Sequence, residues 1–268
     1  MHDSPPRRLT GEEVKAYMND VQAKNFDGYG VSHNWTHIPV LWELPYFSKL
    51  LIRHNIDIMH NEKNVAEAIF NTCLDIPDKT KDNAKARLDQ ELMCNRSHLN
   101  LIEKPNNKWD KPRGPYCLTR ALKKDVMKWF MDLKFPDGYA ANLKRGVNME
   151  QLKIHGLKSH DYHIFMERLL PAMLRGFVNN DVWEALAKLS YFYRLICAKE
   201  VDPMQMLQLE QNIPVVICKL EKIFPPGFFN SMEHLVVHLP YQVRVGGPAT
   251  YIWMYKYERY AELILSYP

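Results

Sequence analysis

Several features that define common protein classes are missing from this sequence of 268 residues. No apolar run reaches about 18 residues, so we expect no membrane-spanning helix. The five cysteines are scattered without a C-x-x-C pair, which argues against a disulfide framework and favours reduced thiols in a nuclear or cytoplasmic protein. The first residues contain no apolar core, so the sequence predicts no secretory signal peptide.

The fixed-spacing motifs of several enzyme classes are missing as well. The sequence contains no Walker loop, no G-x-G-x-x-G and no G-x-S-x-G, which argues against nucleotide-dependent enzymes and serine hydrolases. We therefore expect no small-molecule substrate. The charge balance of 35 basic to 31 acidic residues permits contact with nucleic acid without requiring it.

Helical spacing is what the sequence does contain. Apolar residues recur every three or four positions, and the longest strand-like run is only Val243–Val245. We expect an all-α fold, an irregular multi-helix bundle, with Thr10, Thr119 and Asp202 as N-caps and a further capping box at Asp181. Helices are predicted over 10–22, 44–54, 62–74, 80–93, 119–133, 159–175, 181–196, 232–238, from 251, and as two helices divided by Pro214 between 203 and 224.

Positive charge is concentrated between residues 104 and 128, where eight basic side chains face only two acidic ones. Trp109 and Tyr116 lie among them, and aromatic rings can stack on bases while basic groups contact phosphates. A solvated helix face and loop is an equally good interpretation. The candidate DNA-binding residues are Lys108, Lys111, Arg113, Arg120, Lys123, Lys124 and Lys128.

Two histidine pairs raise the question of a metal site. His160 and His163 are three residues apart, and His234 and His238 are four apart on an expected helix. A structural zinc site would need four ligands from such pairs. Imidazoles that hydrogen-bond within a helical core are the more common outcome, so we assign no metal ligand.

Three carboxylates could carry catalysis. Asp57 precedes His60 by three residues, Glu62 lies at an expected helix start, and Glu258 is surrounded by aromatic residues. Taken alone, each is better interpreted as a helix cap or as half of a surface ion pair.

Longer motifs link these residues to a known family. The sequence resembles the transposases of plant CACTA (En/Spm-type) transposons, first at the end of the transposase domain and, from about residue 168, in the domain of unknown function that follows it. The motifs that carry this resemblance are 44–47, 53–60 (RHNIDIMH), 62–65 (EKNV), 79–89, 156–163 (GLKSHDYH), 218–229 (CKLEKIFPPGFF), 234–240 and 246–260.

The resemblance implies a DDE-type transposase with an RNase H-like core, whose three carboxylates hold two Mg²⁺ ions. Asp57 and His60 match an Asp-x-x-His element near the start of a helical insertion, and Glu258 matches the third acid, with Glu62 as the competing candidate. The first two aspartates have no counterpart here. We therefore expect a truncated fragment that needs no cofactor alone and does not cleave DNA alone, with transposon DNA and other transposase chains as partners.

Sequence composition and the resemblance together divide the chain into four segments. Residues 1–42 are an irregular lead segment, 43–102 the helical end of the transposase domain, 103–116 a basic linker loop, and 117–268 the helical domain of unknown function. The alternative function is a domesticated, non-enzymatic helical module for protein interactions.

Overall fold

The computed structural model describes residues 7–23, 38–105, 108–136, 143–254, 257 and 260–261. The chain forms two compact units, residues 1–55 and residues 56–268, called the first and second unit below. Most described residues are helical, which confirms the predicted all-α irregular bundle. No helix among these residues is both long and apolar enough to cross a membrane. The four segments inferred from the sequence and the family resemblance stay a prediction.

The first unit is built around helix α1 (Gly11–Ala23) and two short 3₁₀ turns at Val40–Glu43 and Phe47–Lys49. The predicted cap at Thr10 is confirmed. The Glu13 backbone N–H donates to Thr10 Oγ1 at 3.2 Å, and Glu13 Oε2 accepts from the Thr10 backbone N–H at 2.8 Å. These two bonds form a capping box that satisfies the free donors at the start of the helix.

The helix predicted over 44–54 was wrong. The backbone leaves the helical region at Leu50, where φ is −67° and ψ is 134°. Phe47 is buried, but Leu50 and Leu51 are 39% and 67% exposed, so the later part of the apolar stripe that would have stabilised a helix is not buried. A short helix without a packing surface is not stable by propensity alone, which explains the difference.

The second unit carries the other helices, together with two small antiparallel hairpins. A π-helical turn at Phe165–Leu169 joins two of these helices. The hairpins are β1 (Ile102–Lys104) with β2 (Lys108–Asp110), and β3 (Val147–Asn148) with β4 (Lys153–Ile154). The helices are α2 (Ile58–Cys73), α3 (Ala84–Met93), α4 (Arg120–Asp132), α5 (Ser159–Ile164), α6 (Leu170–Leu174), α7 (Asn180–Ile196), α8 (Pro203–Ile223), α9 (Ser231–Leu235), α10 (Leu239–Gly246) and α11 (Ala249–Ile252).

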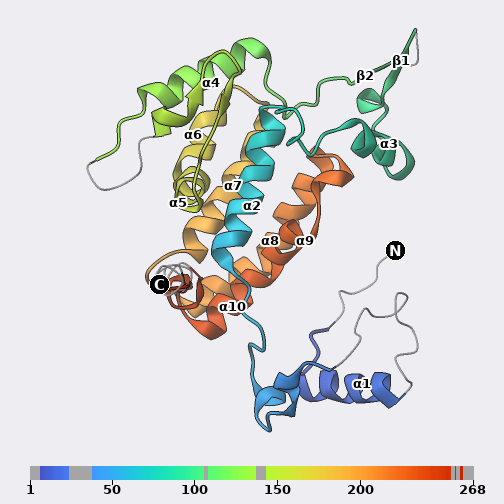
Figure 1. The fold of residues 1–268 in the computed structure, drawn as a ribbon, viewed down its shortest axis with the longest axis vertical. Coiled ribbons are helices and arrows are strands. Elements are labelled where there is room, and N and C mark those ends of the chain that lie inside the picture. The colour runs from blue at the N-terminus through green and yellow to red at the C-terminus, as the bar shows by residue number, and fades with distance from the viewer. Residues whose placement is uncertain are drawn as a thin grey trace, which may run out of the picture. The chain divides into compact units, whose positions relative to one another are not determined.

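Helix α2 runs through the middle of the second unit, where it packs against α5 and α9, while α7 packs against α6 and α8 (Figure 1). Three buried aromatic rings join α2 to its neighbours. Phe70 meets Phe130 and Phe165 edge to face, with ring centroids 6.2 and 5.2 Å apart. Burying each such side chain contributes about 1.5–3 kcal/mol, so this cluster holds α2, α4 and the π-helical turn together.

Helix α8 continues through Pro214, so the predicted division into two helices was wrong. A proline inside a helix lacks the backbone N–H and costs about 3 kcal/mol. Met206, Ile213 and Ile217 are buried on the inner face of α8, on both sides of the proline. Their packing against α7 and α10 offsets that cost.

Candidate functional site

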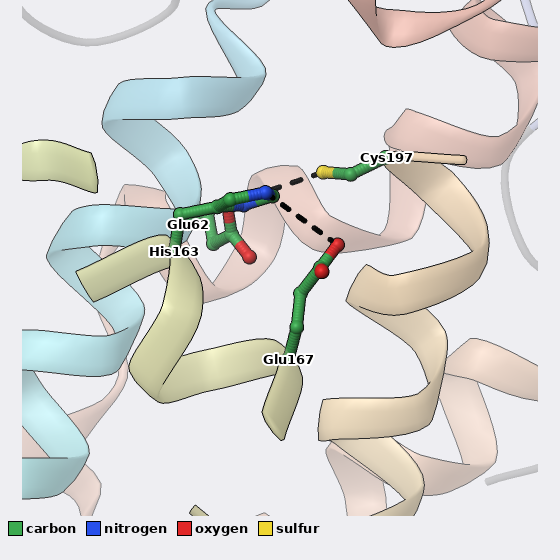
Figure 2. A group of neighbouring side chains, drawn as sticks. All are labelled: Glu62, His163, Glu167 and Cys197. Atoms are coloured by element: carbon green, nitrogen blue, oxygen red, sulfur yellow. Dashed lines mark hydrogen bonds and ion pairs between the residues drawn. The ribbon is translucent and has the colours of Figure 1, made fainter. Parts of the chain in front are cut away.

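Four polar side chains converge in the interior of the second unit (Figure 2). Glu62 comes from α2, His163 from α5, Glu167 from the π-helical turn, and Cys197 directly follows α7. Each offers one donor atom, and these atoms all lie within 4.8 Å of one another. We call these four residues the Glu62 cluster.

Local sequence explains why Glu62 points inward. Asp57 caps α2 by accepting from the Met59 backbone N–H at 3.0 Å, which fixes the first turn of the helix. Residues three, four or seven positions apart then share a face. Ile58, Glu62, Val65 and Ile69 follow this spacing, and all four are buried.

The contacts within the Glu62 cluster are close but incomplete. His163 Nδ1 lies 2.7 Å from Glu62 Oε2, and His163 Nε2 lies 3.8 Å from Glu167 Oε1. The Cys197 thiol lies 3.9 Å from Glu62 Oε2. Glu62 Oε1 is buried and makes no hydrogen bond with a described residue. The Trp253 ring packs edge-on against the imidazole, with centroids 6.3 Å apart.

Burial controls the protonation of this cluster. Removal from water raises the pKa of Glu62 to about 7, although the hydrogen bond with His163 opposes this shift. Burial also raises the pKa of Glu167 and of the Cys197 thiol. Burial lowers the pKa of the His163 imidazole, but the hydrogen bond to Glu62 and the charges of both carboxylates outweigh it, so that pKa is raised. The cluster therefore holds protons that a carboxylate or thiol in water would release more readily.

The structure brings the predicted pair Asp57 and His60 together. Asp57 Oδ1 accepts from the backbone N–H groups of Met59 and His60, and Oδ2 contacts His60 Nδ1. Oδ1 therefore caps α2, while Oδ2 pairs with the His60 side chain. The third predicted residue, Glu258, lies outside the described residues, so its catalytic role stays a prediction.

The described residues do not fit a centre of two Mg²⁺ ions. Mg²⁺ prefers an octahedral shell of oxygen ligands, whereas the Glu62 cluster contributes an imidazole nitrogen and a sulfur. No second group of three or more potential ligands lies this close together in the described part of the chain. We derive no reaction step through Mg²⁺.

The predicted DNA-binding residues divide into two sets. Lys111 lies 2.8 Å from Asp75 Oδ1 and donates to the Asp82 backbone carbonyl at 2.6 Å, while Arg113 donates to the Cys117 carbonyl at 3.2 Å. These two side chains hold their own loop in place. Lys108 is exposed on β2, next to Trp109, which is 54% exposed.

The second set lies on α4. Thr119 accepts from the Leu122 backbone N–H at 3.3 Å, which confirms the predicted N-cap. Arg120, Lys124 and Lys128 follow at intervals of four residues and are exposed, and Lys123 is half-buried beside them. No ion pair between described residues involves these four side chains.

Sequence reasoning missed two members of the Glu62 cluster, Glu167 and Cys197. Glu167 follows His163 by four residues, a spacing that places two potential ligands on one helix face and could have identified Glu167. Cys197 gives no local signal, because its partner Glu62 is distant in sequence. His234 Nε2 and His238 Nε2 lie 3.2 Å apart, so that pair shares a face as predicted.

Comparison with known proteins places part of the chain. Residues 196–267 match the family Domain of unknown function (DUF4218), a domain found in plant transposase-related proteins. This match begins at the last residue of α7 and includes α8 to α11. No curated protein and no solved structure matches the chain.

Proposed function

We propose that this protein is a CACTA-type (En/Spm) transposase-related protein that binds transposon DNA and does not cleave it on its own. The family match over residues 196–267 supports the transposon-related origin. The motifs upstream of that match support the finer assignment, since 53–65 and 156–163 resemble the end of a CACTA transposase domain. Other transposase chains are the expected protein partners.

The observation that carries the DNA-binding role is the basic face of α4. Arg120, Lys124 and Lys128 lie on one side of the helix because a spacing of four residues returns close to the same direction. Exposed basic side chains in such a row can neutralise successive phosphates of DNA and release the counterions of those phosphates. Trp109, exposed in the neighbouring part of the sequence, offers a ring for stacking on a base or sugar.

The carboxylates of the described residues support the proposal that the protein does not cleave DNA on its own. Both oxygens of Asp57 already have partners, in the first turn of α2 and in the His60 imidazole, which disfavours a role for this carboxylate as a metal ligand. A two-metal mechanism needs several carboxylates around both ions. We expect no nicking of transposon-end DNA with Mg²⁺ or Mn²⁺; metal-dependent strand transfer that is lost in Glu258→Gln would overturn this part of the proposal.

The test of DNA binding is its salt dependence, measured by fluorescence anisotropy with a labelled duplex. If about four phosphates are contacted, log K falls against log salt with a slope of about −3 to −4. Replacing Arg120, Lys124 and Lys128 by alanine together reduces that slope by about 0.9 per lost contact. Lys222→Ala is the matched control, because Lys222 is exposed in the last turn of α8 and lies outside the proposed surface.

One observation favours the alternative, a protein-interaction module. On α3, Leu88, Leu92 and Met93 are 45%, 87% and 72% exposed, and exposed apolar side chains that lie together mark interaction surfaces. If the protein does not bind duplex DNA at low salt, or if the triple α4 variant binds as tightly as the parent, the DNA-binding proposal fails and this alternative replaces it.

A further inference from the structure

We propose that the Glu62 cluster is a binding site for one Zn²⁺ ion, with His163, Glu167 and Cys197 as ligands and Glu62 as the carboxylate that orients the imidazole. The inference does not depend on DNA binding, since none of the four residues lies on α4. The class of ion follows from the donors: nitrogen, sulfur and oxygen together suit zinc, which is borderline-soft.

The spacing of the donor atoms suits one ion. Zinc binds sulfur at about 2.3 Å and nitrogen or oxygen at about 2.0–2.2 Å, so donors in a tetrahedral site lie about 3.3–3.8 Å apart. His163 Nε2 and Glu167 Oε1 are already 3.8 Å apart. One donor atom from each of the four residues lies within 4.8 Å of the others, so side-chain shifts on the order of 1 Å would bring the three proposed ligands to tetrahedral spacing.

Glu62 provides an observation that is independent of this spacing. Its side chain is buried, and Oε2 lies 2.7 Å from His163 Nδ1. A metal-bound histidine usually donates its second ring N–H to a carboxylate, which fixes the tautomer and the ring orientation. Nε2 is then left for the ion, and Nε2 is the nitrogen that faces Glu167.

The second oxygen of Glu62 is also unexplained without a ligand. Oε1 is buried and makes no hydrogen bond with a described residue, and such an atom costs about 1–3 kcal/mol. Three protein ligands leave the fourth tetrahedral position of zinc open for water or another molecule. Oε1 is an acceptor for a water that completes the shell.

The fold around the cluster agrees with a ligand site. Glu167 lies in the π-helical turn Phe165–Leu169, and such turns within helices occur frequently at functional sites. The ligands come from separate helical segments of the second unit, so an ion would cross-link α5, the π-helical turn and the end of α7 (Figure 2). His163 and Glu167 keep 17% and 11% of their side-chain surface exposed, which leaves a route for entry.

The test uses the whole chain without a histidine tag, treated with a chelator and then titrated with Zn²⁺ and, separately, with Co²⁺ as a spectroscopic probe. We expect one ion per chain. Bound Co²⁺ should give the sulfur-to-metal charge-transfer absorption that reports a thiolate ligand. Cys197→Ser should abolish this band, and Glu167→Gln should weaken ion binding by more than Glu62→Gln does, for which the loss is about 10- to 100-fold.

Matched controls separate this site from other ligands. Cys218→Ser removes an exposed thiol and should leave the Co²⁺ band unchanged. His234→Ala with His238→Ala removes the other histidine pair and should leave the stoichiometry at one. Circular dichroism shows whether the Cys197→Ser variant folds. If that variant does not fold, loss of ion binding in Glu167→Gln, at a partly exposed residue, tests the site instead. Absence of binding in the parent, or binding that is lost with the His234–His238 pair instead, overturns the proposal.

Discussion

Two buried polar clusters in the second unit differ in how completely their charged groups are hydrogen-bonded. In the first, the fully buried Arg87 guanidinium bonds to Asp82, to the backbone carbonyls of Leu99 and Pro112, and to the Tyr116 hydroxyl. The bonds that its two Nη atoms make are 2.7–3.3 Å long. Both Asp82 oxygens accept from the same guanidinium group. We call this set the Arg87 network.

The Glu62 cluster is less complete and slightly less buried, since the His163 and Glu167 side chains keep 17% and 11% of their surface exposed. The Glu62 carboxylate has one oxygen that pairs with His163 and one oxygen without a hydrogen bond to a described residue. The hydrogen-bonding capacity of this cluster is therefore not fully used. A network in which each group has a partner rigidifies a fold, whereas a partly satisfied one leaves capacity for a ligand. The two clusters therefore differ chiefly in how completely their polar groups are hydrogen-bonded.

The largest effect is expected from breaking the complete network. Asp82→Ala leaves the Arg87 guanidinium buried without its counter-charge, which should lower the free energy of unfolding by about 3–5 kcal/mol. Urea unfolding followed by circular dichroism measures this loss. A double variant with Arg87→Met and Asp82→Leu should be more stable than the single variant, because an apolar pair leaves no buried charge. A loss below about 1 kcal/mol for Asp82→Ala would contradict the comparison.

A smaller effect is expected beside the Glu62 cluster. The Tyr193 hydroxyl donates to Asn61 Oδ1 at 2.7 Å, which links α7 to α2 next to Glu62. Tyr193→Phe removes this buried bond and should cost about 1–2 kcal/mol in the same unfolding measurement. Tyr191→Phe is the control, since Tyr191 is 48% exposed and should change stability little. Equal losses in both variants would show that the bond contributes nothing.

The smallest effect is expected from Glu62→Gln in the presence of a chelator. The amide oxygen can still accept from His163 Nδ1–H, and the change removes a carboxylate whose charge burial disfavours. The free energy of unfolding at neutral pH should therefore fall by less than about 1 kcal/mol. A loss as large as that of Asp82→Ala would mean that the Glu62 cluster is a structural network like the Arg87 network.

Local patterns in the sequence predicted the starts of several helices. The caps at Thr10, Thr119 and Asp202 are confirmed, because a side-chain oxygen that accepts from the backbone two or three residues later is a local interaction. The cap predicted at Asp181 was wrong. Asn179 caps α7 instead, accepting from the Val182 backbone N–H at 3.2 Å. Two capping side chains so close together cannot be ranked from sequence alone.

Tertiary packing decided the features that the sequence did not predict. Pro214 stays within α8 because buried residues on both sides hold the helix together, and local helix propensity does not report such packing.

The candidate site was predicted only in part. His163 and Glu62 were noted separately, but their contact joins α2 to α5 across about a hundred residues, and no periodicity encodes such a pairing.

The junction at which the second unit begins has a mechanical consequence. The Gln242 side chain accepts from the Ile56 backbone N–H and donates to the Ile56 carbonyl, each at 3.1 Å. The Gln242 amide on α10 thereby bonds both backbone polar groups of Ile56, just before the cap of α2, as a neighbouring strand would. A pulling force applied to the chain before Ile56 would have to break these two hydrogen bonds before it could unwind α2.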